Sequence, residues 1–468
     1  MVTVPINITG GTAKFKSRAL STQTMRNFWP RLIDEPLAKS PFIVEAFPGL
    51  KVFGSTAGNA DRGMLEHQGV LYQVAGEKLF SFDSAGTATE LGDIPGSERC
   101  ILFGMLASVV IVTNGSVFEW DGATLTVGTD PDFESPNSGA HLNNQALYDG
   151  DSGRFSVSDV GDPLAIDGLN FATAESNADD LIRVFTFDQL AYMFGEKTIE
   201  TWWNSGIGAP PFDRIEQGII QVGLDALHSV ASDDDFLYWL GDDSQVYRAQ
   251  GSTADVISDQ ALTKVISELV TTSDAIGWTL NLQGTWLYML TFPIAGLTWV
   301  LPRDGEWFEW SFGAVGSRSL ANSYASAFGK HLFGDFQSGN VYELDFDTFT
   351  DNGTTIIRTR DTAPLHGGLV GAPGKRIEMN RFELIMEVGV GLLTGQGSDP
   401  EIMLSFSDDG ANTFGTEMFG KVGKLGEKLF KVEWFVLGSF ESRVIRVKTS
   451  DPVFFSIHSA AADIEIGI

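Results

Sequence analysis

Pairs of apolar residues that end in an aromatic or branched side chain recur along the chain, each followed by a turn and a second apolar run. Examples are Leu71-Tyr72, Leu147-Tyr148 and Leu287-Tyr288. Seven such units lie between residues 71 and 342, and their second positions are 38 to 50 residues apart. A repeat of this length, built from short strands, is typical of β-propeller blades, which bury their faces against one another. Six or seven blades fit the pattern, because the unit at 286–310 is interrupted by an insertion or shares strands with the N-terminal segment.

The segments around the repeats predict the rest of an all-β chain. Residues 1–54 have no period, and four prolines fall between residues 30 and 48, so we expect an extended N-terminal arm that packs on another part or closes a ring. Residues 55–360 form the propeller. An inserted amphipathic helix is predicted near 259–271, with Ser258 as its N-cap, because apolar residues there follow helical spacing.

A second, smaller domain is predicted at the C-terminus. Residues 361–374 are rich in Gly and Pro and indicate a linker. Residues 375–468 then show alternating apolar and polar positions in five runs separated by Gly-rich turns. We expect strands at 378–388, 401–406, 429–436, 443–449 and 453–457. Five or six short strands of this kind predict a small β-sandwich.

Charge is abundant and unevenly distributed. The 468 residues include 61 Asp and Glu against 31 Lys and Arg, for a net charge of −30. This balance argues against binding of duplex DNA by phosphate neutralisation. Residues 1–60 are instead basic, with seven Lys and Arg against three Asp and Glu. Such a basic arm suggests docking against an acidic protein, such as a second copy of the chain; a solvated terminal loop is the alternative. The candidate interface residues are Lys14, Lys16, Arg18, Arg26 and Arg31.

Candidate chemistry is sparse. Paired carboxylates such as Asp242-Asp243 fall in predicted turns, where Asp bonds the nearby backbone. The six histidines are scattered, and neither a nucleophile elbow nor a phosphate loop is present. Residues 407–414 are similar to the Asp-box hairpin of sialidase-like repeats, a structural turn. We therefore expect no enzyme, no cofactor and no metal ligand; a structural calcium ion near Asp345, Asp347 and Asp351 is left open.

The sequence also gives expectations about compartment. Cys100 is the single cysteine, so no internal disulfide can form, and its apolar surroundings predict a small buried residue. Met1 to Gly11 lack the apolar core of a signal peptide. The longest apolar run, at 100–112, is too short to span a bilayer. We expect a protein without membrane insertion.

Longer segments, in the same order along the chain, resemble the packaged-DNA stabilisation proteins of short-tailed bacteriophages, which form the tail hub or nozzle. These segments are RNFWP at 26–30 with FPGL at 47–50, DFLYWLG at 235–241 with VYR at 246–248, LYMLTFP at 287–293, FGD at 333–335 with GNVYEL at 339–344, and residues 405–452 with their SDDG turn. The resemblance covers most of the chain and is weakest over residues 55–230. Phe28-Trp29 stand where the family usually has Tyr.

The resemblance implies a structural virion protein of the tail, present in the host cytoplasm during assembly. It implies a ring of six copies below the portal and its adaptor, which extends the DNA channel and retains the genome until ejection. Tail fibres or spikes and a plug or needle would bind to it. DNA would pass without specific binding, and we expect the lumen to be lined by the surplus Asp and Glu.

Two rival functions remain open. One is a peripheral receptor-binding tail protein whose propeller grips a glycan through aromatic residues such as Trp202-Trp203. The other is a propeller hydrolase, which the carboxylate content permits and the lack of a recognisable site disfavours.

Overall fold

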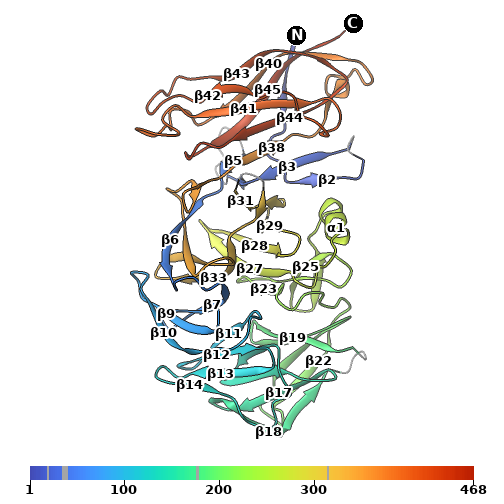
Figure 1. Cartoon of the computed structure of the whole chain (residues 1–468). Coiled ribbons are helices and arrows are strands. Elements are labelled where there is room, and N and C mark those ends of the chain that lie inside the picture. Colours follow the sequence, from blue (N-terminus) through green and yellow to red (C-terminus); the bar gives the residue numbers. More distant parts are fainter. Residues whose placement is uncertain (18–19, 34–40, 175–178, 314–315, 468) are drawn as a thin grey trace.

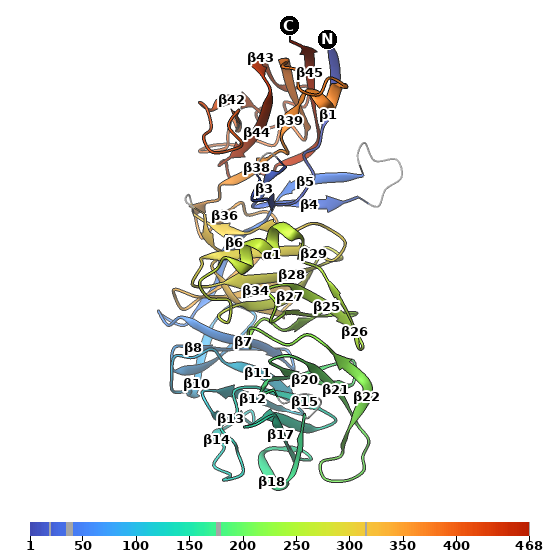
Figure 2. The same cartoon turned by 90° about the vertical axis from the view of Figure 1, so that its right-hand side faces the viewer.

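The chain folds into a β-propeller and a β-sandwich, which confirms the predicted fold class. A computed structural model describes residues 1–17, 20–33, 41–174, 179–313 and 316–467. The two parts are stacked along one long axis, and both termini lie at the far end of the sandwich (Figures 1 and 2).

Seven four-stranded antiparallel blades make up the propeller in the described residues. Blade 1 contains β7 (Asp61–His67), β8 (Val70–Ala75), β9 (Lys78–Phe82) and β10 (Ala88–Asp93). Blade 2 contains β11 (Ile101–Met105), β12 (Ser108–Thr113), β13 (Ser116–Trp120) and β14 (Leu125–Val127). Blade 3 contains β15 (Gly139–Leu142), β16 (Gln145–Asp149), β17 (Arg154–Asp159) and β18 (Asp162–Thr173). Blade 4 contains β19 (Leu181–Phe187), β20 (Leu190–Gly195), β21 (Ile199–Asn204) and β22 (Phe212–Ile220). Blade 5 contains β23 (Ala231–Ser232), β24 (Leu237–Leu240), β25 (Val246–Gln250) and β26 (Thr253–Val256). Blade 6 contains β27 (Ile276–Leu282), β28 (Thr285–Phe292), β29 (Leu297–Pro302) and β30 (Phe308–Glu309). Blade 7 contains β33 (Ala321–Ala327), β34 (Lys330–Asp335), β35 (Asn340–Asp345) and β6 (Gly49–Ser55).

The recurring apolar pair is the second strand of each blade: β8, β12, β16, β20, β24, β28 and β34. This strand has a blade on either side, so both of its faces are covered and its sequence reads as an apolar run. Val110, Tyr148 and Phe333 are fully buried there. The repeat therefore marks the packing between blades.

The seventh blade is completed from the start of the chain. Its outer strand is β6, which pairs antiparallel with β35 from Asn340 opposite Ser55 to Asp345 opposite Gly49. The end of the segment expected to be an arm thus closes the ring. Pairing of the first and last parts of the propeller ties its two ends together.

The rest of the N-terminal segment lies within the sandwich. One sandwich sheet contains β1 (Val2–Ile6), β4 (Phe28–Leu32), β5 (Phe42–Ala46), β40 (Ile377–Met386), β43 (Val432–Phe440) and β45 (Ser456–Ile466). The other contains β2 (Ala13–Lys14), β3 (Thr22–Arg26), β38 (Arg358–Asp361), β39 (Leu365–His366), β41 (Glu401–Ser407), β42 (Met418–Lys421) and β44 (Ser442–Thr449). Five strands of the first 48 residues therefore pair inside these sheets, and the segment is not a free arm.

One continuous sheet joins the two domains. Blade 6 ends in β30, which meets β3 in parallel at Glu309 opposite Arg26, and the sheet continues through β38, β44, β41 and β42. The apolar core is also continuous, because Phe47 packs 5.5 Å from Phe308 and 5.3 Å from Trp310 between ring centroids. The expected linker at 361–374 starts inside β38 and includes β39 and the short 3-10 helix η1 (Gly367–Val370).

The remaining short strands lie around blades 6 and 7. They are β31 (Ser311–Phe312), β32 (Ser317–Arg318), β36 (Thr350–Asp351) and β37 (Thr354–Thr355). The first two form a hairpin between the blades, and β36 extends the sheet of blade 7 by pairing with β6.

The predicted helix exists but is shorter than expected. Helix α1 (Gln260–Ser267) buries Leu262 and Ile266 against blades 5 and 6. Its N-cap is Asp259, whose carboxylate accepts a hydrogen bond from the Leu262 amide at 2.7 Å, so the prediction of Ser258 was wrong. The Ser258 hydroxyl instead accepts from the Val246 amide at 3.0 Å and so holds strand β25.

Candidate functional site

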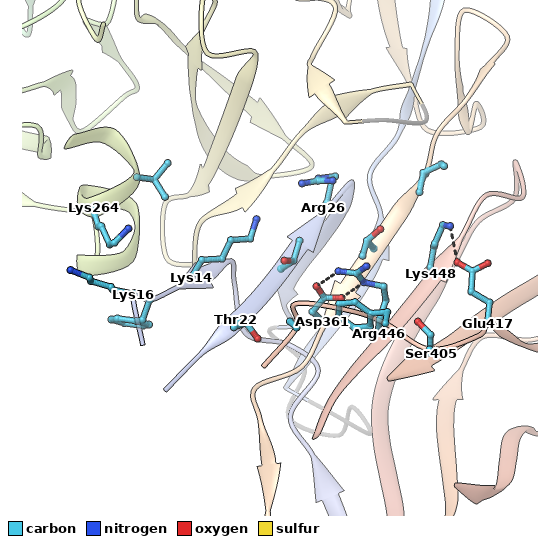
Figure 3. Close-up of a pocket in the computed structure, with 18 residues that line it drawn as sticks. Lys14, Lys16, Thr22, Arg26, Lys264, Asp361, Ser405, Glu417, Arg446 and Lys448 are labelled. Carbon is cyan, nitrogen blue, oxygen red and sulfur yellow. Dashed lines mark hydrogen bonds and ion pairs between the residues drawn. The ribbon is translucent and has the colours of Figure 1, made fainter. Parts of the chain in front are cut away.

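The junction of the two domains contains a groove of about 880 Å³, called here the interdomain groove. Helix α1, the hairpin of β2 and β3, and strands β38, β41 and β44 form its walls (Figure 3). Most of the charged residues in its lining are basic. The cations that line it are Lys14, Lys16, Arg26, Lys264, Arg446 and Lys448. A concentration of positive charge on a chain of net charge −30 makes this groove the candidate interaction surface.

On the hairpin wall, two cations are held by one buried carboxylate. Glu309 of β30 is 5% exposed and accepts from Lys14 Nζ at 2.7 Å and from Arg26 Nε at 2.9 Å. Burial of Glu309 opposes ionisation, but the two cations outweigh it and lower its pKa. The pair fixes the hairpin on blade 6 and leaves the outer parts of both cations partly exposed in the groove.

On the sandwich wall, two cations alternate along β44 and therefore face the same side. Arg446 makes a bidentate ion pair with Asp361, with N–O distances of 2.7 and 2.8 Å. Its guanidinium also lies 3.5 Å from the centre of the Phe414 ring. Lys448 pairs with Glu417 at 2.8 Å. These contacts hold the cationic groups at fixed positions in the wall.

The Asp-box-like segment is a turn that places Phe414 in this wall. The Asp409 carboxylate accepts hydrogen bonds from the Asn412 and Thr413 amides at 2.9 and 3.0 Å, and from the Thr413 hydroxyl at 2.6 Å. The Ser407 and Thr413 side chains lead the bonds that lower the pKa of Asp409. Its role is structural, as expected from the resemblance to the box.

Two further lysines border the groove opening. Lys264 of α1 pairs with Glu268 at 2.6 Å, one helical turn along. Lys16 is exposed and forms no ion pair with any residue that the structure describes. Counted with their four carboxylate partners, the six cations leave an excess of positive charge. The groove can therefore hold a negatively charged segment.

The five predicted interface residues have different positions. Lys14, Lys16 and Arg26 line the groove together. Arg31 lies elsewhere, paired with Glu45 at 2.7 Å and stacked 4.7 Å from the centre of the Trp29 ring, at the edge of another cavity. Arg18 lies outside the described residues.

The sequence did not predict three of the groove cations, which are Lys264, Arg446 and Lys448. The alternation of Arg446 and Lys448 along a predicted strand placed both on one face. Nothing in the sequence connected that face with residues more than 400 positions earlier.

The residues considered for other chemistry have structural roles in the described part of the chain. Asp243 accepts from the Gln245 amide at 3.1 Å and from the Tyr247 hydroxyl at 2.7 Å, and Asp242 pairs with Lys197 at 2.7 Å. Trp202 is 7% exposed and packs on Phe155, whereas Trp203 is 45% exposed. The glycan-binding alternative therefore retains one exposed aromatic residue of the pair.

Neither a metal cluster nor a membrane-spanning helix is found among the described residues. No group of three or more His, Cys, Asp or Glu residues there could hold a metal ion. Asp345 pairs with Lys51 at 2.8 Å, and Asp351 is buried and accepts from the Leu50 amide at 3.2 Å. Cys100 is buried, as expected. No helix in the described residues is long and apolar enough to cross a membrane.

Comparison with solved structures gives only distant similarities. The WD40 domain of Neurospora crassa Pan2 is 10% identical with a TM-score of 0.44, covering 64% of this chain and 96% of that one. BamB from Moraxella catarrhalis is 12% identical with a TM-score of 0.38, covering 74% and 98%. The computationally designed Ika8 protein is 11% identical with a TM-score of 0.40, covering 63% and 99%. Similarity this distant says nothing about function.

Family models give a specific result. No curated protein matches the sequence significantly. The model for the β-propeller of bacteriophage P22 Gp10 matches residues 2–349, and the model for its β-sandwich matches residues 364–465. The two matches follow the order of the two domains and cover nearly the whole chain. The chain therefore belongs to the phage-stabilisation family of bacteriophage P22 Gp10, structural proteins of the phage tail that stabilise packaged DNA.

Proposed function

We propose that this protein is the hub, or nozzle, of a short phage tail. Six copies form a ring below the portal and adaptor, extend the channel, and retain the packaged genome until ejection. Fibres or spikes and a plug attach to the ring. Membership of the P22 Gp10 family over both domains is the observation that carries the proposal. A structural component of a virion needs no catalytic site, and the proposal assigns none.

The rigid connection of the two domains supports this role. A sheet of eleven strands and one apolar core run from blade 6 into the sandwich, so force on one domain reaches the other. All-β platforms of this kind also leave little exposed strand edge. A ring that holds a pressurised genome requires this resistance to deformation.

Charge supports both the channel and the subunit contacts in the proposal. An acidic lumen lets DNA slide, because like charge offers the phosphates no gain from counterion release. The interdomain groove, in turn, would receive an acidic segment of the neighbouring copy. Every copy carries an excess of 30 negative charges, so a complementary surface is always available. A lumen rich in Lys and Arg in the assembled ring would contradict the first part.

Charge reversal in the groove tests the subunit contact. The double variant Lys16→Glu with Lys264→Glu changes two side chains that make few internal contacts, so the fold should survive. We expect at least tenfold less of the chain in particles and a matching loss of DNase-resistant genome. The measurements are quantitative immunoblotting of purified particles and DNase protection of their DNA.

A matched control is Lys375→Glu, which reverses an exposed lysine near the C-terminal end of the sandwich. It should assemble as the unchanged protein does. Normal incorporation of the groove variant, with a native circular dichroism spectrum, would contradict the groove contact. Deletion of residues 1–30 is a poorer test, because β1, β3 and β4 belong to the folded sheets.

A further inference from the structure

Three arginines from different blades meet near the axis of the propeller. Arg99 precedes β11, Arg183 lies in β19 and Arg318 ends β32, just before β33. Strands β11, β19 and β33 are the inner strands of blades 2, 4 and 7, and all three begin on the same face of the propeller. Arg183 and Arg318 are 8% and 5% exposed. Arg99 and Arg318 line one cavity. Burial and then the charge of Arg99 lower the pKa of Arg183 to about 10, so Arg183 also lies within the field of Arg99.

None of these three guanidinium groups has a carboxylate within 4 Å among the described residues. Arg99 Nη1, Arg183 Nε and Arg318 Nε are buried and have no hydrogen-bond acceptor. Other donors of the cluster are satisfied, since Arg318 Nη2 donates to the Ala321 carbonyl at 3.1 Å and to Asn322 Oδ1 at 3.0 Å, and Arg183 Nη1 donates to the Leu227 carbonyl. The neighbouring Arg62 guanidinium donates to three backbone carbonyls and to the Thr113 hydroxyl. Buried charge without a partner is costly, and three like charges together increase that cost.

A cavity of about 680 Å³ opens beside two of the arginines. The charged residues that line it are Arg62, Arg99, Arg318, Asp61 and Glu77. Uncharged residues of blades 6 and 7, among them Ile276 and Asn322, line it as well. It lies on the face where the inner strands begin. The cavity gives a ligand access to this cationic cluster from solvent.

The carboxylates near the cluster are engaged with other groups. Asp61 accepts from Gln73 Nε2 at 3.0 Å and from Asn322 Nδ2 at 3.2 Å. Asp149 accepts from the Asn137 and Ser138 amides at 3.0 and 2.6 Å. Asp274 accepts from the Ile294 amide at 2.7 Å. These hydrogen bonds come from amides, and Arg99 Nη1, Arg183 Nε and Arg318 Nε remain without an acceptor.

We propose that this cavity binds a phosphate group, held by the guanidinium groups of Arg99 and Arg318 and supported by the charge of Arg183 behind them. Guanidinium forks match the oxygens of a phosphate, and two negative charges would offset the repulsion among the arginines. Because the ligand contacts blades on both sides of the ring closure, it would also hold those blades together. The source is either free phosphate or the terminal phosphate of a nucleic acid, which present the same chemistry.

Thermal unfolding and titration calorimetry of the full-length protein test this site. Inorganic phosphate is compared with chloride at equal ionic strength, and a 5′-phosphorylated oligonucleotide is compared with its unphosphorylated form. The main variant is Arg99→Gln, because the Arg99 guanidinium makes no hydrogen bond to a described residue, and its loss should not disturb folding. Arg318→Met is the second variant, and Arg376→Gln on the sandwich surface is the control.

We expect one phosphate site on the unchanged protein and on Arg376→Gln, with binding at least tenfold weaker in Arg99→Gln and Arg318→Met. In chloride, Arg99→Gln should still fold, because Arg99 makes no ion pair within 4 Å and interacts with the charge of Asp61 only over a longer distance. Binding of the phosphorylated oligonucleotide alone, with the same loss in the variants, would identify a terminal phosphate as the ligand. Equal stabilisation of all four proteins by phosphate, without calorimetric binding, would overturn the proposal.

Discussion

Single residues of this protein carry buried charge in distinct ways. Glu309 is surrounded by two cations, whereas Asp149 is held by backbone amides. Arg360 is fully buried and donates from Nε to the Ile8 carbonyl at 2.8 Å and from Nη2 to the Gln23 side chain at 2.8 Å. This last contact clamps the N-terminal segment onto β38. Each arrangement predicts a different response to pH or substitution.

Asp149 provides a prediction about pH. Burial, only partly opposed by the Ser138 and Asn137 amides, raises its pKa to about 6. The folded state therefore holds this proton more tightly than the unfolded state, and the carboxyl contributes less stability as the pH rises from about 4 to about 6. Asp149→Asn removes this titration. We expect the free energy of unfolding of the variant, relative to the unchanged protein, to rise by about 1–3 kcal/mol over that interval and then to stay constant.

Urea unfolding at pH 4, 5, 6 and 8 measures this difference. Asp151→Asn, an exposed neighbour, serves as the control and should show a constant difference. A constant difference for Asp149→Asn as well would mean that the carboxyl titrates normally in the folded state.

At the residue scale, local chemistry was predictable and distant pairing was not. The turn role of Asp409 follows from residues 407–413, all within seven positions. The N-cap was misplaced by one residue because Ser258 and Asp259 are both good caps, and the choice depends on the contact of Ser258 with β25. The pair of Arg26 with Glu309 joins residues 283 positions apart, and neither residue indicates the other.

At the scale of elements, too, pairing between strands that are distant in sequence could not be predicted. Periodic apolar pairs identified the second strand of all seven blades, because that strand is buried on both faces wherever it occurs. Strand β6 was assigned to an arm, since its partner β35 lies about 290 residues later and its own short sequence resembles any edge strand. The β-sandwich was predicted from its C-terminal strands, but those contributed by the N-terminus were not.

The contact of β6 with blade 1 gives a prediction at this scale. A methyl group on Gly54 would lie 2.4 Å from the Gly86 carbonyl oxygen, which is backbone and cannot rotate away. We expect Gly54→Ala to lower the free energy of unfolding of the propeller by about 1–3 kcal/mol, because the strand must shift at the ring closure. Guanidinium unfolding measures the change. Gly415→Ala is the control, since its nearest atom is at 3.6 Å; equal stability of both variants would show that the closure tolerates the shift.

The whole molecule combines an acidic body with a basic groove at the domain junction. Its two domains share a sheet and a core, so the groove has a fixed shape that a neighbouring copy could recognise. This shape arises from three segments that are distant in sequence, which explains why only the N-terminal part of the groove was predicted. Family membership gives the role in the phage tail, and the hub assignment rests on how the copies are arranged in the particle.

The number of copies in the particle tests the central claim most directly. Quantitative mass spectrometry of purified virions would count this chain relative to the portal protein. The account predicts about one copy for every two portal subunits, as for a six-fold ring below a twelve-fold portal. A ratio well above one to two would place the chain in peripheral fibres or spikes, and its absence from virions would contradict a tail role altogether.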